Sequence, residues 1–429
     1  MSIIVETSKI EKVSRFISHE EENVYIEIPF FVPAGIEQIK VKMDVTKEGA
    51  TSSIIDLGIK DPNRVRGWSG GARTEFFIHL AKATPGYLHG ELPEGEWAVI
   101  LGAYKVAKKG CTVNLTIEYA KEEFRWLKGD LHTHSVHSDG KFTLREKADI
   151  AERDGLDFVA LTDHNTSSQN EAYPRDVNTL FIPGMELTTN WGHLNFFGVS
   201  DPVRDFRVNN MEDLHAQLEE GRKRGAYISL NHPYCRNTGW RLEWDFDYDW
   251  VEVWNGPWRE DNQAALDWWQ EQLVSGKRLV AVGGSDTHRP DPYVVHGMPT
   301  TWVYSKSLTS AEILKAIDRG HVVLSYSPQG PFIDLTCGTS MAGDICEDTK
   351  HPVLLNVKNT EFSDVVKVIS NHGIELEVLV EEGQDTLDLS LPAEERFFYR
   401  VEVWRYFPQV KSRLLAALSN PIYFRNALS

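Results

Sequence analysis

Long apolar runs are missing from this sequence of 429 residues. No stretch of about 18 consecutive apolar residues occurs, which argues against a membrane-spanning helix. Basic side chains are also outnumbered, with 45 Lys and Arg against 63 Asp and Glu. The resulting net charge of -18 disfavours nucleic acid as a partner, because phosphate binding selects basic faces. We therefore expect a small-molecule partner rather than nucleic acid or a membrane.

Cysteine is scarce as well. The four cysteines, Cys111, Cys235, Cys337 and Cys346, form no Cys-x-x-Cys motif. Cys337 and Cys346 are near enough in sequence to pair, but reduced thiols are the favoured interpretation. Met1–Lys9 has no basic segment followed by an apolar one, so the sequence predicts no secretory signal and a cytoplasmic location. No pattern in the sequence predicts the oligomeric state.

The hydrophobic fraction of 41% supports folded cores, and its periodicity divides the chain into three zones. In residues 1–123, segments such as Val24–Ile28 and Thr112–Ile117 alternate apolar and polar residues on a period of two. This zone is predicted to be an N-terminal β-sandwich. Residues 327–429 contain further short strands, such as Val353–Val357, and are predicted to form a small C-terminal β domain.

The central zone, residues 124–326, alternates helical and strand patterns. Helices are expected at Leu144–Arg153, Met211–Arg224, Ala264–Gly276 and Ser310–Arg319. Each is followed by a predicted strand, at residues 157–162, 226–230, 279–283 and 321–324. Alternation of this kind predicts an α/β fold with a largely parallel sheet or barrel.

Histidines and carboxylates recur at or near the ends of these predicted strands. They are His132, His134, Asp139, His164, Glu186, His193, His232, Asp286 and His288. In α/β folds the reacting groups lie at the carboxyl ends of strands, so we expect these side chains to meet in one pocket. Alternation along an extended chain should also turn His132 and His134 to the same side, and likewise Asp286 and His288.

Imidazole and carboxylate ligands suit Mn, Zn or Fe ions, and the motifs contain no cysteine for a thiolate site. Nine ligands exceed what one ion uses, so two or three divalent ions are predicted. Bound cations make hydroxide available at neutral pH, which favours a hydrolase. His296 is a candidate proton donor, and Arg289 a candidate partner of the transferred group. Arg236, Arg241 and Tyr234 are candidates for substrate binding.

Taken together, five motifs resemble those of the PHP (polymerase and histidinol phosphatase) superfamily. They are Gly129–Ser135, Ser138–Gly140, Thr162–Asn165, Asn231–Pro233 and Ser285–His288. Within that superfamily, Gly192–Asn195, the N-terminal β region and Leu418–Tyr423 are similar to CehA/McbA-type metallohydrolases. The resemblance implies a distorted (β/α)7 barrel flanked by the two β domains.

The resemblance also implies three sets of metal ligands. His132, His134, Glu186 and Asp286 would hold one ion, Asp139, His164 and His288 a second, and Glu186, His193 and His232 a third. Glu186 would bridge two ions. Many members of the superfamily have His at the position of Asp139. The interval from Glu186 to His193 is shorter than in nucleotide-phosphatase members, which argues against carrying over their substrate.

Three functions are compatible with these residues. The leading hypothesis is a phosphoesterase that hydrolyses a small phosphate mono- or diester, which the nearby arginines favour. The second is a metal-dependent carboxylic ester, amide or carbamate hydrolase, which the aromatic residues around Trp191, Tyr234 and Trp244 favour. The third is a non-catalytic, metal-stabilised binding protein. Retention of all nine candidate ligands argues against the third.

Overall fold

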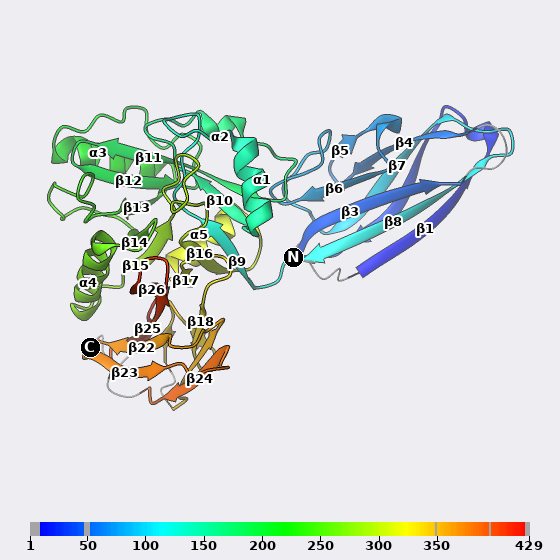
Figure 1. The fold of residues 1–429 in the computed structure, drawn as a ribbon. Coiled ribbons are helices and arrows are strands. Elements are labelled where there is room, and N and C mark those ends of the chain that lie inside the picture. The colour runs from blue at the N-terminus through cyan, green and yellow to red at the C-terminus, as the bar shows by residue number, and fades with distance from the viewer. Residues whose placement is uncertain (1–8, 47–51, 348–349, 394–395, 425–429) are drawn as a thin grey trace. The chain divides into compact units, whose positions relative to one another are not determined.

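The computed structural model describes residues 9–46, 52–347, 350–393 and 396–424. Residues 1–8, which carry most of the prediction about a secretory signal, lie outside that range. The chain divides into two compact units, Met1–Phe124 with Arg175–Val177, and Arg125–Pro174 with Asn178–Ser429 (Figure 1). None of the helices in the described part of the chain combines the length and apolar character needed to cross a membrane.

Two four-stranded antiparallel sheets make up the first unit. One has the order β1-β8-β3-β6 and the other β2-β7-β4-β5. Their strands are β1 (Lys9–Ile17), β2 (Tyr25–Val32), β3 (Ile36–Val45), β4 (Ile54–Lys60), β5 (Val65–Trp68), β6 (Glu75–His79), β7 (Gly95–Lys105) and β8 (Cys111–Lys121). Alternate residues of β8, such as Val113 and Leu115, are buried in one hydrophobic core shared with β7, because successive side chains of a strand point to opposite faces.

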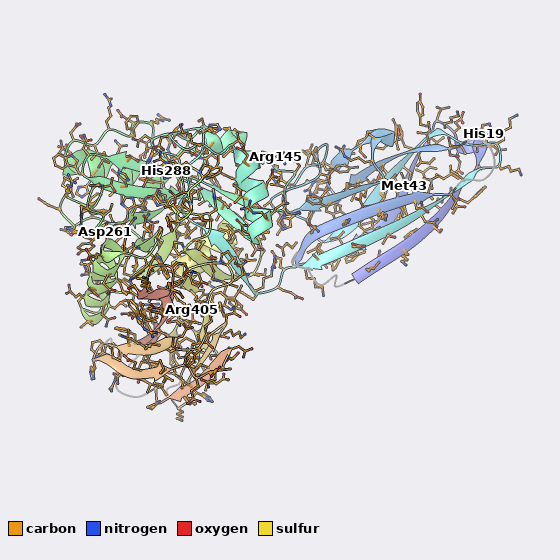
Figure 2. The ribbon with its side chains drawn as sticks, in the orientation of Figure 1. His19, Met43, Arg145, Asp261, His288 and Arg405 are labelled. Atoms are coloured by element: carbon orange, nitrogen blue, oxygen red, sulfur yellow. The ribbon has the colours of Figure 1, made fainter. Side chains whose placement is uncertain are left out.

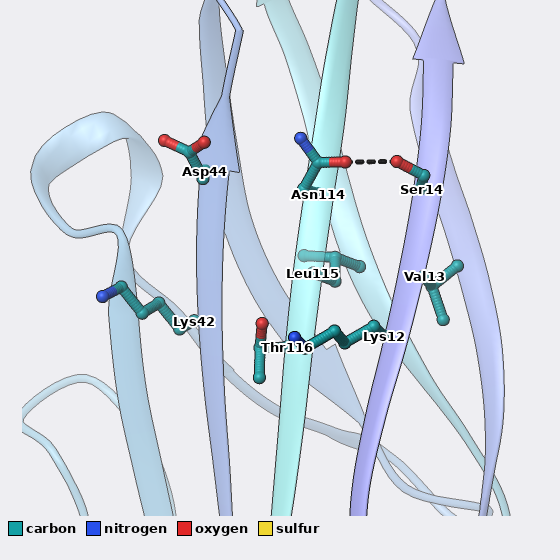
Figure 3. Close-up of a pocket in the computed structure, with 8 residues that line it drawn as sticks. All are labelled: Lys12, Val13, Ser14, Lys42, Asp44, Asn114, Leu115 and Thr116. Atoms are coloured by element: carbon teal, nitrogen blue, oxygen red, sulfur yellow. Dashed lines mark hydrogen bonds between the residues drawn. The ribbon is translucent and has the colours of Figure 1, made fainter.

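The first unit also carries a shallow pocket over β1, β3 and β8 (Figure 3). Its charged lining residues are Lys12, Lys42 and Asp44, and Ser14 donates a hydrogen bond to Asn114 beside them. One carboxylate between two ammonium groups is not a set of metal ligands. This pocket is therefore not a candidate metal site, in contrast to the histidine cluster of the second unit.

A mixed sheet runs through the second unit. Its main path is β15-β14-β13-β12-β11-β10-β9-β16-β17-β26-β25-β22-β23. The strands nearest the predicted site are β9 (Arg125–Asp130), β10 (Phe158–Leu161), β11 (Leu180–Thr189), β12 (Gly192–Phe197), β13 (Tyr227–Asn231), β14 (Trp250–Asn255), β15 (Val280–Gly284), β16 (Thr300–Ser305) and β17 (Val322–Ser325). The rest of the path is β22 (Val365–Ser370), β23 (Gly373–Leu379), β25 (Phe398–Phe407) and β26 (Ser412–Ser419), with β20 (Ile345–Cys346) and β27 (Ile422–Phe424) beside it.

Four of the five α-helices in the described residues begin close to where the sequence predicts them. The five are α1 (Leu144–Asp154), α2 (Gln169–Ala172), α3 (Met211–Lys223), α4 (Glu260–Val274) and α5 (Ser310–Asp318), and the short helix α2 was not predicted. Helix α1 begins at a capping box, in which the Thr143 side chain accepts from the Glu146 backbone and the Glu146 side chain accepts from the Thr143 backbone. It ends at Gly155, whose φ of 77° is easy only for glycine. Helix α4 begins four residues before its predicted start.

The sheet is less regular than the predicted alternation. β11 turns directly into β12 through a tight hairpin in which Thr189 faces Gly192, so β12 runs antiparallel to both of its neighbours. No helix lies between β13 and β14 either. A parallel neighbour needs a long crossover, whereas a two-residue turn can only produce an antiparallel one. The sheet is therefore mixed and strand-rich rather than largely parallel.

The last hundred residues are mostly strands. A separate sheet has the order β19-β18-β21-β24, with β18 (Phe332–Cys337), β19 (Ser340–Met341), β21 (Val353–Lys358) and β24 (Thr386–Leu391). β17 pairs with β26, so the main sheet continues past residue 326, and a domain boundary there stays a prediction. Cys337 and Cys346 lie in the core beside these strands, with their sulfur atoms 2.7 Å apart.

Candidate metal centre

Two short extended segments carry four of the predicted ligands. Thr133 and Thr287 form a parallel bridge just beyond β9 and β15. The bridge is held by hydrogen bonds from the His134 amide to the Thr287 carbonyl (3.0 Å) and from the Asp286 amide to the His132 carbonyl (2.8 Å). The Thr133 hydroxyl points the other way and donates to the Ala160 carbonyl at 2.7 Å. The flanking side chains therefore share the opposite side, as the spacing predicts.

Gly284 is required by this close approach. A Cβ on Gly284 would lie 2.3 Å from the His132 Cβ and 2.7 Å from the His132 backbone nitrogen. No side chain fits in that space, so glycine lets the end of β15 lie directly against the His132 segment. Asp286 follows two residues later with φ of 55°, a left-handed conformation that is unusual for a residue other than glycine.

Glu186 lies at the centre of the cluster. Its Oε1 is 3.2 Å from His132 Nε2, 3.2 Å from His193 Nδ1 and 3.5 Å from His232 Nε2. Its Oε2 is 2.6 Å from His164 Nδ1. The carboxylate is fully buried, and it lies within β11 because the strand continues through Thr189 instead of ending before Glu186 as the sequence predicts.

A second group of ligands lies at the more exposed edge of the cluster. His164 Nε2 and His288 Nε2 are 3.3 Å apart, and both face Asp139 Oδ1, at 3.6 and 3.3 Å. The ring of His134 stacks on both of these imidazoles. The Asp139 side chain is 64% exposed, and those of His164 and His288 are 23% and 24% exposed. Figure 2 labels His288 among the loops of the second unit.

The remaining two predicted ligands complete a third group. His193 at the start of β12 and His232 directly after β13 are both buried and lie beside Glu186. Like Asp286, His232 has a positive φ, of 28°. Backbone strain of this kind persists only where the surrounding structure holds it, and it is common at functional sites.

All nine predicted ligands therefore lie together, and their atoms suit bound cations. Four sets have ligand atoms within 4.8 Å of one another: His132, His134 and Asp286; His134, Asp139, His164 and His288; Glu186, His193 and His232; and His132 and His232 with Glu252 of β14. Within the described residues, His132 Nε2 and both ring nitrogens of His134 are buried without a hydrogen-bond partner. Buried polar atoms nearly always have a partner, and a metal ion would supply the missing one here. The donor set suits Zn²⁺, Mn²⁺ or Fe ions.

The charges in the cluster follow from burial and from the proximity of opposite charges. Burial raises the pKa of Glu186, but His193 and His132 outweigh it and hold that pKa well below its ordinary value. The pKa of Asp286 is likewise well below its ordinary value, with burial outweighed by His132 and His134. Burial lowers the pKa of His134 to about 4. Ionised carboxylates and a neutral imidazole are the forms that bind metal.

Sequence reasoning missed Glu252. This buried carboxylate lies in the middle of β14, whose six residues are all buried, and its Oε1 is 2.9 Å from His132 Nδ1. Its Oε2 accepts hydrogen bonds from the His232 amide and from Asn255 Nδ2, each at 3.1 Å. The sequence does contain a signal for Glu252, because it is the single carboxylate in the apolar run Trp250–Trp254. A charge in a buried strand needs a partner, which would have pointed to the histidine ligands.

The predicted proton donor lies apart from the ligands. His296 is buried, with its Nε2 3.3 Å from the Nζ of buried Lys147 and its ring edge-on to Phe142. Burial and then Lys147 and Arg153 lower the pKa of His296 well below its ordinary value. Its ring is therefore uncharged at neutral pH, which does not favour proton donation, and the role of His296 stays a prediction.

The predicted substrate-binding residues lie on the surface of the second unit. Arg236 and Arg289 are exposed, and within the described residues neither guanidinium donates a hydrogen bond to protein. Arg241 is exposed, and its Nη2 donates to the Asn237 carbonyl at 2.9 Å. Tyr234 is 36% exposed, and its ring packs near Trp244 with centroids 5.8 Å apart. Arg289 directly follows His288, and Tyr234, Arg236 and Arg241 lie two, four and nine residues after His232.

Comparison with known proteins gives short or distant likenesses. No family model matches the chain. The sequence is 46% identical to the DNA polymerase/3'-5' exonuclease PolX of Bacillus subtilis over 43 residues, 10% of this chain and 8% of that enzyme. It is 37% identical to a 5'-3' exoribonuclease of Haemophilus influenzae over 67 residues, 15% of this chain and 24% of that enzyme. The chain thus spans a small part of both enzymes.

This chain matches almost the full length of a third sequence relative. An uncharacterized protein of Methanocaldococcus jannaschii is 27% identical over 160 residues, which are 33% of this chain and 90% of that protein.

Three solved structures are distantly similar, each at 18% identity. A two-domain protein of Bacteroides vulgatus, said to contain a predicted PHP-like metal-dependent phosphoesterase, has a TM-score of 0.41 over 68% of this chain and 95% of its own. A putative metal-dependent phosphoesterase of Bifidobacterium adolescentis and an amidohydrolase of Chromobacterium violaceum both have TM-scores of 0.30 over 39% of this chain, with 90% and 89% of their own chains covered. Similarity at TM-scores this low carries no information about function, so the proposed function depends on the candidate metal centre of this chain.

Proposed function

We propose that this chain is a metal-dependent hydrolase of the PHP type, and that its substrate is a small phosphate mono- or diester. The observation that carries the proposal is the burial of His132 Nε2 without a hydrogen-bond partner, facing Glu186 Oε1 at 3.2 Å and Asp286 Oδ1 at 3.5 Å. Most buried polar atoms have a partner, and a metal ion bound between this nitrogen and the two carboxylates would supply one here.

Each of three ligand sets would hold a separate ion. His132, His134 and Asp286 would hold one ion, with Glu186 bridging it to a second ion held by His193 and His232. His134, His164, His288 and Asp139 would hold another at the exposed edge. When bound, divalent ions lower the pKa of water and polarise the phosphoryl or carbonyl oxygen, which is the chemistry of hydrolysis. Because the exposed edge is formed by Asp139, His164 and His288, substrate would reach the cluster from that side.

A barrel is part of the same proposal. Strands β9 to β15 are consecutive in the sheet, and the bridge between Thr133 and Thr287 links the segments that follow its first and last strands. The hydroxyl of Thr301 on β16 also donates to the Gly283 carbonyl on β15, at 2.7 Å. These contacts support a distorted barrel of the PHP kind, with the ligands at one end of it.

Exposed guanidinium groups favour phosphate over other substrates. Arg289 directly follows a ligand, and Arg236 lies four residues after His232. Within the described residues neither guanidinium donates a hydrogen bond to protein. Arg side chains bind phosphate through two parallel hydrogen bonds. We therefore propose Arg289 and Arg236 as substrate contacts, and Arg241 as a third, less available one.

A second candidate function keeps the metals and changes the bond. The rings of Tyr234, Trp244 and Trp268 form a cluster, with 4.8 Å between the centroids of the two tryptophans. Partly exposed aromatic rings, of which Tyr234 lies two residues after His232, would suit an organic ester, amide or carbamate. This observation keeps carbonyl-centred hydrolysis as the alternative.

The test uses metal-stripped protein to which Mn²⁺, Fe²⁺ or Zn²⁺ is restored. Each sample is offered a chromogenic phosphate monoester, a phosphate diester and a carboxylic ester, and the bound metal is measured in parallel. We expect metal-dependent phosphate ester cleavage. Cleavage of the carboxylic ester alone would establish the second candidate instead. Two or more bound ions without turnover would favour a metal-stabilised binding protein.

A further inference from the structure

We propose that Glu252 is a positioning residue that orients three metal ligands at once, although it binds no ion itself. The inference rests on the proposed function, because it takes His132, His232 and Asp286 to be ligands. It goes beyond that function by assigning a role to β14, the strand between β13 and β15 that contributes no ligand at its end.

The first contact selects which nitrogen of His132 faces the ions. Glu252 Oε1 lies 2.9 Å from His132 Nδ1, while His132 Nε2 faces Glu186 and Asp286 without a hydrogen-bond partner. A carboxylate can only accept, so Glu252 holds a proton on Nδ1, and a metal ion bound beside Glu186 and Asp286 would take the lone pair of Nε2. A carboxylate behind a ligating imidazole fixes the ring and raises its basicity.

The second contact supports a strained backbone. Glu252 Oε2 accepts from the His232 amide at 3.1 Å, at the residue whose φ is 28°. An uncommon backbone conformation needs compensating contacts, and a hydrogen bond to a charged carboxylate is one of the stronger kinds. The same carboxylate therefore stabilises the turn that aims His232 at Glu186.

The third contact passes through Asn255 at the end of β14. Its Nδ2 donates to Glu252 Oε2 at 3.1 Å and lies 3.3 Å from Asp286 Oδ2. Asn255 is held in turn by Asn262, whose Oδ1 accepts from the Asn255 amide at 3.1 Å. Glu252 and Asn255 thus link ligands from the ends of β9, β13 and β15, which lie far apart in the sequence.

Glutamine cannot replace Glu252 in this arrangement. Oε1 faces the donor of His132, and Oε2 faces the donors of His232 and Asn255. An amide has one oxygen and one NH₂ group, so one side would place two donors against each other. The variant E252Q keeps the size of the side chain and removes only the acceptor pattern and the charge.

The experiment measures Zn²⁺ affinity of the full chain by competition with a chromophoric chelator. For E252Q we expect the Kd of the tightest site to rise about 10- to 100-fold, with an unchanged number of ions at saturation. The matched control is E402Q, which changes another buried glutamate on a strand of the same unit, bonded to Arg400 and Trp404. E402Q should bind Zn²⁺ like the wild type.

Three results would overturn the proposal. They are an unchanged Kd in E252Q, an equal loss of affinity in E402Q, and one ion fewer at saturation in E252Q, which would make Glu252 a ligand. If E252Q does not fold, the proposal can still be tested on the wild type. Nitrogen NMR of the Zn²⁺-loaded, histidine-labelled wild type should show His132 protonated at Nδ1. A proton on Nε2 would contradict the inference. Failure of the proposed function is distinct, because it would be seen in the wild type itself, as absence of Zn²⁺ binding or as bound ions without hydrolysis.

Discussion

Thr133 and Thr287 pair in parallel beyond the ends of β9 and β15, and their side chains point away from the ligand cluster. This pairing fixes the two three-residue motifs side by side, so the residues on either side of each threonine face the cluster together. Two motifs separated by about 150 residues of sequence thereby become one half of the candidate metal centre. The predictions below follow from that arrangement and from the packing around it.

Replacing His132 tests the site as a whole. H132A should abolish hydrolysis and reduce the bound metal, because the imidazole lies between Glu186, Asp286 and Glu252. Metal content is measured by elemental analysis, and folding of the strands by circular dichroism. H215A is the matched control, since His215 is an exposed residue of α3 in the same unit. Full activity in H132A would refute the site assignment.

Replacing Asp139 separates the exposed ligand set from the buried ones. D139A should weaken only the ion held with His164 and His288, because Asp139 approaches no other ligand nitrogen within 4.0 Å in the described residues. Titration calorimetry with Zn²⁺ should therefore lose one binding step and retain the others. D149A, an exposed aspartate of α1, provides the control. Loss of every binding step in D139A would show that the sets are not separate.

Gly284 is expected to tolerate no side chain. In G284A the new methyl group would lie 2.3 Å from the His132 Cβ, so the His132 segment or β15 must shift. Overpacking of this kind costs about 1–3 kcal/mol of unfolding free energy, and the shift should also weaken metal binding. Urea unfolding and Zn²⁺ titration measure the two effects. G71A should change neither, because the atom nearest its new methyl group, at 3.2 Å, belongs to the side chain of Ile54.

Asp61 should make the stability of the first unit depend on acid pH. Burial raises its pKa, but hydrogen bonds from Arg66 and from the amides of Asn63 and Arg64 outweigh burial and lower it. The stability it contributes is present above the unfolded pKa of about 3.9 and is lost as the pH falls through the lower folded pKa.

The variant D61N tests this sign. At pH 7 the free energy of unfolding of D61N should be about 3 kcal/mol lower than that of the wild type, because buried Arg66 loses its charged partner. The difference should shrink as the pH falls below about 4, because Asp61 of the unfolded wild-type chain takes up a proton there before Asp61 of the folded state does. Urea unfolding followed by tryptophan fluorescence measures both values, with D44N on the exposed face of β3 as the control. A difference that does not depend on pH would contradict the assignment.

The sequence by itself was enough to identify the candidate ligands and most helices. His132, His164, Glu186 and Asp286 could be chosen because their motifs are local and lie near the ends of periodic segments. The capping box at Thr143 and Glu146 is equally local, and α1 begins there. Such features depend on neighbours a few residues away, so they can be read without knowledge of the fold.

Tertiary structure decided the rest. The role of Glu252 follows from contacts with His132 and the His232 amide, which are 120 and 20 residues away, and no local pattern encodes them. The direction of β12 depends on the hairpin closed by Thr189 and Gly192 rather than on hydrophobic periodicity, which is the same for parallel and antiparallel strands. Periodicity reports which face of an element is buried, whereas the partner it is buried against is determined only when distant strands pack together.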